Sequence, residues 1–145
     1  MKTCRNCEAE LPLTEFYNLT SSEDGKHPEC KSCCKVNRAL EGVRKRDKRS
    51  KMSTRQIHRA RYLGVAIDED IKLVEVFRRE RGICYICKRW VQPRHASMDH
   101  EKPLSKGGTH TWDNVRLTHL VCNLVKGDRP AHKYKKYKKH KSIRF

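Results

Sequence analysis

Cysteine spacing is the feature that most constrains how this 145-residue chain folds. Only 36% of the residues are hydrophobic and 35% are charged, so a large apolar core is not available. A chain this polar usually needs disulfides, metal ions or a partner to stay folded. It has eight cysteines, and six of them form C-x2-C pairs: Cys4 and Cys7, Cys30 and Cys33, and Cys84 and Cys87.

Whether the cysteines form disulfides or bind metal depends on the cellular compartment of the protein. The first residues, from Met1 to Cys4, lack the charged-then-apolar pattern of a secretory signal. No apolar run approaches the length needed to span a membrane, so no membrane association is expected. We therefore expect a reducing, cytoplasmic location, where close cysteine pairs bind metal more often than they form disulfides.

The first two pairs predict one structural zinc site. They are separated by 22 residues, a spacing typical of zinc ribbons and treble clefs, in which four thiolates surround a tetrahedral ion. The predicted ligands are Cys4, Cys7, Cys30 and Cys33. Cys34 is left over, either as a bystander or as an alternative to Cys33, and His27 is interpreted as a loop residue.

The third pair predicts a second structural zinc site. Cys84 and Cys87 supply two ligands from one tight turn and need two more. His119 and Cys122 are three residues apart on a predicted helix, so both can face the same ion. The alternative, an exposed helical histidine at position 119, would leave the site incomplete.

The predicted architecture is a small, zinc-stabilised α+β protein with two zinc units joined by a basic linker. The linker is expected to be partly helical, without a clear apolar stripe, and to order on DNA. The boundaries are a four-cysteine module at 1–36, the linker at 37–66, a C-terminal domain at 67–128 and a basic tail at 129–145.

Within the C-terminal domain, periodicity predicts a helix with Ile71, Val74 and Phe77 on its apolar face, capped by Asp68 or Asp70 and stopped by Gly82. Alternation then predicts a strand over 96–100, and a loop and a second short strand over 115–118 follow. The residues from 119 to 126 read as a helix, because Gly127 and Pro130 follow them. The predicted order is strand, loop, strand, helix.

Positive charge is concentrated in two segments. The net charge is +17, and residues 35–61 carry eleven Lys and Arg against two acids, while residues 129–145 carry eight and no acid. The simplest explanation is that these segments bind a nucleic acid and release its counterions. The alternative is that the charge only keeps the chain soluble or belongs to a disordered tail. The predicted nucleic-acid contacts are Arg44, Lys45, Arg46, Arg116, Lys126, Lys135 and Lys136.

Several motifs resemble the HNH endonucleases, particularly those of phages. These are Asp99-His100, the segment from Pro103 to His110, Trp112-Asp113-Asn114, and the segment from His119 to Gly127. The resemblance runs from 84 to 128 and implies a ββα-metal fold, in which a hairpin and a helix hold one catalytic metal ion. The four-cysteine unit also resembles zinc modules found ahead of HNH domains in phage proteins.

The residue types suit phosphodiester hydrolysis. His100 can act as general base, because an imidazole titrates near neutral pH. Asp99 and Asn123 can offer a carboxylate and an amide oxygen to Mg²⁺ or Mn²⁺, which keep several waters and need few protein ligands. Asn114, the middle asparagine of the family, is expected to fix the loop after His100. Where some relatives have a histidine, this chain has Asn123.

Three alternatives stay open at this stage. The first is a non-catalytic zinc module that binds DNA or RNA, which would not require Asp99, His100 and Asn123 together. The second is a nuclease of the same fold that cuts RNA. Our preferred reading is a double-stranded DNA endonuclease that leaves 5′-phosphate and 3′-hydroxyl ends. One such site cuts one strand, so either a homodimer or a nicking monomer is compatible with the sequence.

Overall fold

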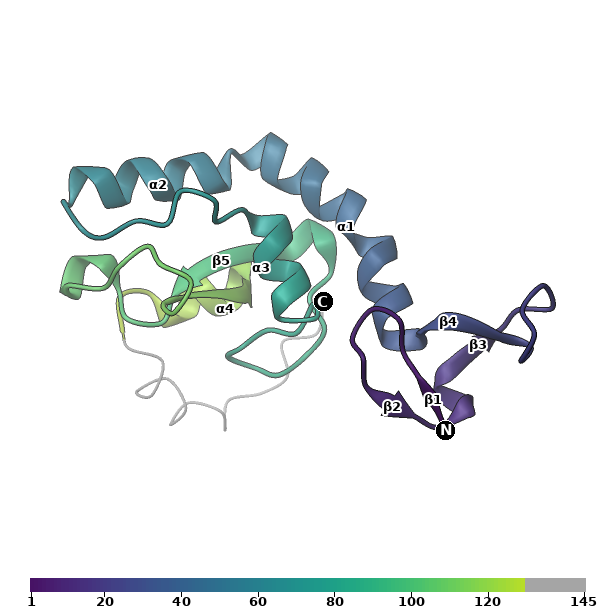
Figure 1. Ribbon diagram of the computed structural model, residues 1–145. Helices are drawn as coiled ribbons and strands as arrows, with labels where there is room; N and C mark the ends of the chain where they lie inside the picture. The colour runs from purple at the N-terminus through teal and green to yellow at the C-terminus, as the bar shows by residue number, and fades with distance from the viewer. Residues whose placement is uncertain (130–145) are drawn as a thin grey trace.

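The computed structural model describes residues 1–129, and within this range it is a small α+β protein, as predicted (Figure 1). Lys135 and Lys136 lie outside the described residues. None of the helices described is long and apolar enough to cross a membrane.

The N-terminal part consists of two antiparallel strand pairs. β1 (Lys2–Thr3) pairs with β2 (Glu10–Leu11), and β3 (Phe16–Asn18), preceded by the short 3-10 turn η1 (Leu13–Glu15), pairs with β4 (Lys26–Cys30). Phe16 and the cysteines form a small core of their own, against which Leu11 packs. A core this small buries little apolar area, so metal ligation is the natural source of the remaining stability.

A long basic helix connects this part to the rest. α1 (Lys31–Ser50) and α2 (Met52–Tyr62) are separated at Lys51, whose φ of 51° breaks the helix. Contrary to the prediction of a linker without an apolar stripe, Val36, Leu40 and Val43 lie at helical spacing on one buried face of α1. The segment from 37 to 43 is therefore part of the main core.

Gly42 has a packing role in α1. A Cβ atom added at Gly42 would lie 2.9 Å from the Cβ of Pro93, in the 3-10 turn η2 (Pro93–His95). Gly42 lies inside the helix, and its lack of a side chain allows this close approach.

The next helix, α3 (Leu73–Arg79), begins later than predicted. Its N-cap residue is Lys72, with no side-chain cap, so the prediction that Asp68 or Asp70 caps it is wrong. The Asp68 carboxylate accepts a hydrogen bond from the backbone N–H of Trp112, and that of Asp70 accepts one from its indole N–H. Both acids serve a tertiary contact instead.

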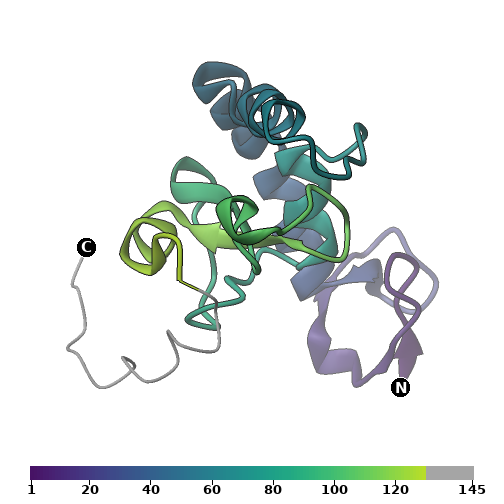
Figure 2. The ribbon, with the colours of Figure 1, turned by 90° about the vertical axis from the view of Figure 1, so that its left-hand side faces the viewer.

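The main sheet is a two-stranded hairpin. β5 (Ala96–His100) pairs antiparallel with β6 (Val115–His119), with Met98 opposite Leu117, and the connection contains η3 (Leu104–Lys106). α4 (Leu120–Lys126) follows β6 directly, so the predicted order of strand, loop, strand and helix is confirmed. α3 and α4 pack on opposite faces of the hairpin (Figure 2).

Alternation along β5 assigns its side chains to those two faces. Met98 is fully buried in the core that α1 and α3 share. Ser97 and Asp99 face α4, where they bond to Asn123 and Lys126 respectively. The strand thus separates an apolar layer from a polar layer beneath α4.

Candidate functional site

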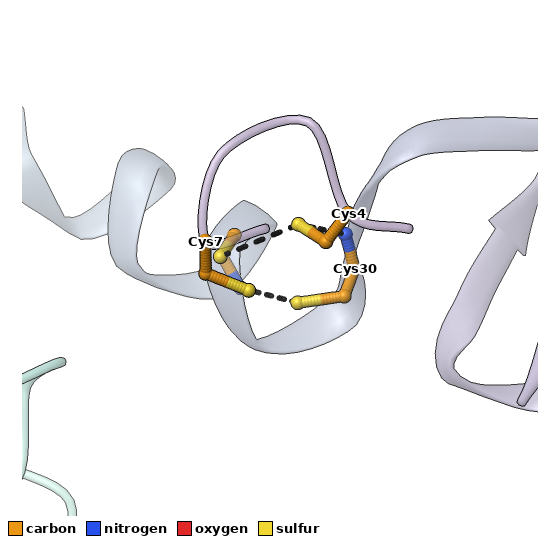
Figure 3. A group of neighbouring side chains, drawn as sticks. Cys4, Cys7 and Cys30 are labelled. Carbon is orange, nitrogen blue, oxygen red and sulfur yellow. Dashed lines mark hydrogen bonds between the residues drawn. The ribbon is translucent and has the colours of Figure 1, made fainter. Parts of the chain in front are cut away.

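Four cysteine side chains gather in the N-terminal part. The sulfur atoms of Cys4, Cys7, Cys30 and Cys33 all lie within 4.8 Å of one another. Cys4 and Cys7 come from the β1–β2 turn, and the other two from the β4–α1 junction (Figure 3). The distances and the four soft ligands fit one zinc ion, as the spacing predicted.

Backbone amides prepare this cluster for thiolate. The N–H of Cys30 points at the Cys4 sulfur at 3.2 Å. Burial opposes ionisation of Cys4, but backbone N–H groups of Cys30, Cys7 and Asn6 lower its pKa to about 6. A thiolate is the form that binds metal, so the turn favours ligation at neutral pH.

The leftover Cys34 is buried beside the cluster and is not part of it. Its sulfur lies 3.5 Å from Nδ1 of His27 and 3.6 Å from the carbonyl of Glu29. Burial raises the pKa of the Cys34 thiol, so it stays protonated and packs as a small apolar group.

A second cluster ties α4 to the loop after α3. The ligand atoms of Cys84, Cys87, His119 and Cys122 also lie within 4.8 Å of one another. His119 offers Nδ1 to the cluster, 3.3 Å from the Cys87 sulfur, while its Nε2 lies 3.0 Å from the carbonyl of Trp90. That carbonyl can accept only if Nε2 carries the proton, which leaves the Nδ1 lone pair for a metal.

The turn between Cys84 and Cys87 packs tightly against its neighbours. Gly82 precedes it at a φ of +70°, and a Cβ atom there would lie 2.4 Å from the ring of Trp90. Only glycine fits this conformation and this contact. The two clusters together fit two structural zinc ions.

Asp99 occupies a buried polar site between β5 and α4. The residue is 7% exposed. Its carboxylate accepts a hydrogen bond from the hydroxyl of Tyr85 and lies 3.0 Å from the ammonium of Lys126. Burial raises the pKa of Asp99, and the bonds from Tyr85 and Lys126 oppose that shift.

Lys126 was predicted to contact phosphate, and the structure contradicts this. The residue is fully buried, and its ammonium donates to Asp99 and to the carbonyl of His100 at 2.9 Å. Position 126 is one turn beyond Cys122, on the side of α4 that faces the hairpin. The sequence pattern did not show which side of the helix is buried.

Asn123 lies on the same side of the hairpin as Asp99. Its amide nitrogen donates to the Ser97 hydroxyl at 3.2 Å and to the Met98 carbonyl at 3.1 Å. Because the nitrogen is used in this way, the side-chain oxygen is the atom that Asn123 can offer to a cation.

The His100 side chain leaves β5 on the opposite face from Asp99. The residue is 6% exposed, and its Nε2 lies 3.0 Å from Nδ1 of His110. Burial, followed by the nearby His110, Arg59 and Lys126, lowers the pKa of His100 to about 3, so the ring is neutral at pH 7. His110 is fully buried.

Asn114 holds the loop that follows His100. Its side-chain oxygen accepts from the N–H of Lys102 at 2.8 Å, and its nitrogen donates to the carbonyls of Lys102 and Thr109 at 2.9 and 2.7 Å. These bonds join the beginning and the end of the loop, the type of contact expected of this residue.

A basic depression lies where α1 meets η2. It has a volume of about 610 Å³, and its charged lining residues are Lys45, Arg46, Arg49 and Arg94, with no acid among them. Arg46 also donates to the carbonyl of Ala96, at the start of β5. This arrangement places a cationic surface next to the strand that carries Asp99.

Three of the predicted cationic contacts, Arg44, Lys45 and Arg116, are paired with acids. Arg44 and Lys45 lie 3.9 and 3.7 Å from Glu41 in exposed ion pairs. Arg116 is bonded to Glu80 and Glu101, which balance its charge and raise its pKa.

The sequence interpretation missed Tyr85 and the cations Arg49 and Arg94. Tyr85 stood inside a C-x2-C turn, where intervening residues are usually exposed, and nothing in the spacing indicated that its hydroxyl reaches Asp99. Arg94 joins the depression only through the packing of η2 on α1, a contact between segments about fifty residues apart.

Comparison with known families assigns the C-terminal segment. A protein-family model described as HNH endonuclease matches residues 84–129. The comparison with curated proteins found no match. The matched segment contains the second cluster, the β5–β6 hairpin and α4, together with Asp99, His100, Asn114 and Asn123. Residues 84–129 are therefore an HNH endonuclease domain.

Proposed function

We propose that this protein is a metal-dependent endonuclease that hydrolyses double-stranded DNA at the β5–β6–α4 unit. The observation that carries the proposal is the placement of Asp99 and Asn123 together on the α4 side of β5, next in sequence to a neutral His100. We interpret this unit as the ββα-metal arrangement expected of HNH nucleases.

In the proposed reaction, His100 takes a proton from a water molecule whose oxygen attacks the phosphorus atom. The bond from phosphorus to the 3′-oxygen breaks, and that oxygen leaves with a proton from solvent, giving 5′-phosphate and 3′-hydroxyl ends. A neutral imidazole is the form that can accept the proton. Burial lowers the pKa of His100 to about 3, well below the near-neutral value expected from the sequence, which keeps the ring neutral at pH 7 and makes it a weaker base than a free imidazole.

The catalytic cation would be held by Asp99 and Asn123. Carboxylate and amide oxygens are hard ligands that suit Mg²⁺ or Mn²⁺. The Asp99 carboxylate already bonds to Tyr85 and Lys126, so a cation bound here would share the carboxylate with them. A cation bound there supplies positive charge to the phosphate during attack.

We propose that α1 and the basic depression contact the DNA backbone. The depression contains Lys45, Arg46, Arg49 and Arg94, and Arg44 is exposed on the same helix. Several cations that line one surface, with no acid among the lining residues, are typical of phosphate binding. Arg116 stays a predicted contact nearer to the hairpin, and Lys135 and Lys136 stay predicted contacts of the tail.

The zinc clusters and the organisation of the chain complete the proposal. Both clusters would hold structural zinc in a reducing cytoplasm, with the four-cysteine module at 1–36, the basic segment at 37–66, the nuclease domain at 67–128 and the tail at 129–145. One site cuts one strand. A homodimer would therefore be needed for a concerted double-strand break.

One observation favours a second candidate function, a zinc module that binds nucleic acid without cutting it. Asp99 and His100 are 7% and 6% exposed, and Lys126 already neutralises the carboxylate. A site that never admits metal or water would show the same burial and the same ion pair.

The test is cleavage of matched 40-mer duplex DNA, single-stranded DNA and RNA by zinc-loaded protein, with Mg²⁺, Mn²⁺ or no added divalent ion. The proposal expects cleavage of the duplex only when a divalent ion is added, with products that a DNA ligase can rejoin. Tight binding of the duplex without cleavage in any ion would favour the binding module. Cleavage of RNA alone would assign the domain to a ribonuclease.

A further inference from the structure

A pair of buried histidines joins the hairpin to the loop before β6. His100 and His110 are 6% and 0% exposed, their ring centroids are 5.2 Å apart, and Nε2 of the first lies 3.0 Å from Nδ1 of the second. A hydrogen bond at this distance requires one ring to donate and the other to accept.

The backbone of His110 is fixed from outside the HNH segment. Its N–H donates to the carbonyl of Ala66, and its carbonyl accepts from the N–H of Asp68, both at 2.9 Å. These two bonds hold the loop against the stretch between α2 and α3. The position of the His110 ring is therefore set by a part of the chain that the family model does not match.

The far side of the His110 ring has no hydrogen-bond partner among residues 1–129. Its Nε2 is buried and makes no hydrogen bond with any of residues 1–129. Within the described chain, the polar contact of this side chain is thus the one with His100. A buried polar atom without a partner is costly, and a catalytic role or an ordered water molecule is among the explanations for it.

The direction of the shared hydrogen bond decides whether His100 can act as a base. If His110 donates, a neutral His100 must carry its proton on Nδ1 and has no free lone pair. If His100 donates through Nε2, its Nδ1 keeps a lone pair that can accept a proton from water. The two arrangements differ in chemistry although the atoms occupy the same places.

We propose that His110 is a positioning residue that accepts the Nε2–H of His100 and so holds the catalytic imidazole in the base-competent tautomer and in a fixed orientation. The inference rests on the proposed role of His100 as general base. It adds that the base is oriented by the side chain of His110, whose backbone is anchored on residues 66–68.

The direct test is NMR of the zinc-loaded full chain labelled with ¹⁵N-histidine, in two-bond correlation spectra that distinguish the tautomers. The expected result is that His100 carries its proton on Nε2 in the wild type. His110→Asn should preserve this tautomer, because its side-chain oxygen can accept at nearly the same place as Nδ1. His110→Leu should give a mixture of tautomers. The matched control is His58→Leu, an exposed histidine on α2.

Plasmid nicking by the same variants gives the kinetic readout. His110→Leu should lower kcat tenfold or more with little change in KM, His110→Asn should restore at least a third of the wild-type kcat, and His58→Leu should behave as wild type. If His110→Leu does not fold, the wild-type tautomer and the His110→Asn variant decide the matter.

Two results would overturn the proposal: a wild-type His100 protonated on Nδ1, or a folded His110→Leu variant with unchanged tautomer and kcat. Failure of the proposed function is recognised separately. In that case His100→Ala would nick DNA as fast as the wild type, whatever the NMR spectra show about His110.

Discussion

The ammonium of Lys126 lies 3.0 Å from the carboxylate of Asp99, and both residues are buried. Lys126 is carried by α4, the helix that also contributes Cys122 to the second cluster. Tyr85, between the two cysteines of the facing turn, donates to the same carboxylate. The elements that the cluster joins are thus the elements that orient Asp99.

Removing the ammonium should be strongly destabilising. Lys126→Met would leave the buried Asp99 carboxylate without its counter-charge, and breaking a buried pair in this way costs about 3 kcal/mol or more. Urea unfolding of zinc-loaded protein measures the loss. In the double variant Asp99→Asn with Lys126→Met, much of the stability should return, because no unpaired charge remains.

Lys106→Met is the control for that series, since it removes an exposed ion pair with Asp128 at 3.3 Å. We expect a change within about 0.5 kcal/mol for it. Equal effects of Lys106→Met and Lys126→Met would show that the buried pair is not a stabilising contact.

Each cysteine cluster should bind one zinc ion. Metal analysis of the purified chain is expected to give two ions per molecule. Cys4→Ser should reduce this to one, because three ligands hold zinc much more weakly than four. Cys34→Ser should leave it at two, since Cys34 lies outside the cluster. Loss of zinc in the Cys34 variant would assign that cysteine to the site.

Stability should fall on mild acidification because of His100. Its pKa in the folded protein is lowered to about 3 from the usual 6.5. The unfolded chain therefore binds the additional proton between these values, so the stabilisation is complete above pH 6.5 and is lost as the pH falls towards 3. Between pH 7.5 and 5.5 we expect this residue to lower the free energy of unfolding by roughly 1 kcal/mol.

Denaturant midpoints measured across that range test the prediction. His100→Gln should show a shallower fall, and the difference between the two proteins removes the contribution of zinc-ligand protonation, which both share. Parallel curves for the wild type and His100→Gln would contradict the assignment of a buried, neutral imidazole.

Local patterns in the sequence predicted much of the architecture. C-x2-C spacing and the i, i+3 pair of His119 and Cys122 are local, and the structure brings both sets of side chains together. Alternation over β5 and the glycine after α4 likewise gave the hairpin and helix in their correct order. Each of these features depends on residues within one turn or one strand.

Features that depend on distant contacts were missed. The buried stripe of α1 consists of three apolar residues among many cations, and only packing on α3 shows its significance. Lys126 is an ordinary basic residue at a helix end until Asp99, 27 residues away, is seen to face it. Such contacts follow from the way the elements pack, which periodicity does not report.

Neutralising the basic depression should weaken DNA binding without affecting the fold. The double variant Arg49→Gln with Arg94→Gln removes two exposed cations, so the slope of log affinity against log salt should become shallower by about 2. Fluorescence anisotropy with duplex DNA between 50 and 300 mM salt measures this slope.

Arg78→Gln is a suitable control, because Arg78 is exposed but paired with Glu75 in a depression that also contains acids. We expect its salt slope to match that of the wild type. An unchanged slope in the double variant would mean that DNA binds elsewhere on the molecule.

The central claim is that Asp99, His100 and Asn123 form a nuclease site, and nicking of supercoiled plasmid in Mg²⁺ tests it most directly. Wild-type protein should convert the plasmid to the open circle. His100→Ala and Asn123→Ala should be at least about a hundredfold slower while keeping two zinc ions and normal DNA affinity, since a positioned general base contributes about that much or more. Nicking by His100→Ala at the wild-type rate, or tight binding by the wild type without nicking in any divalent ion, would contradict the account.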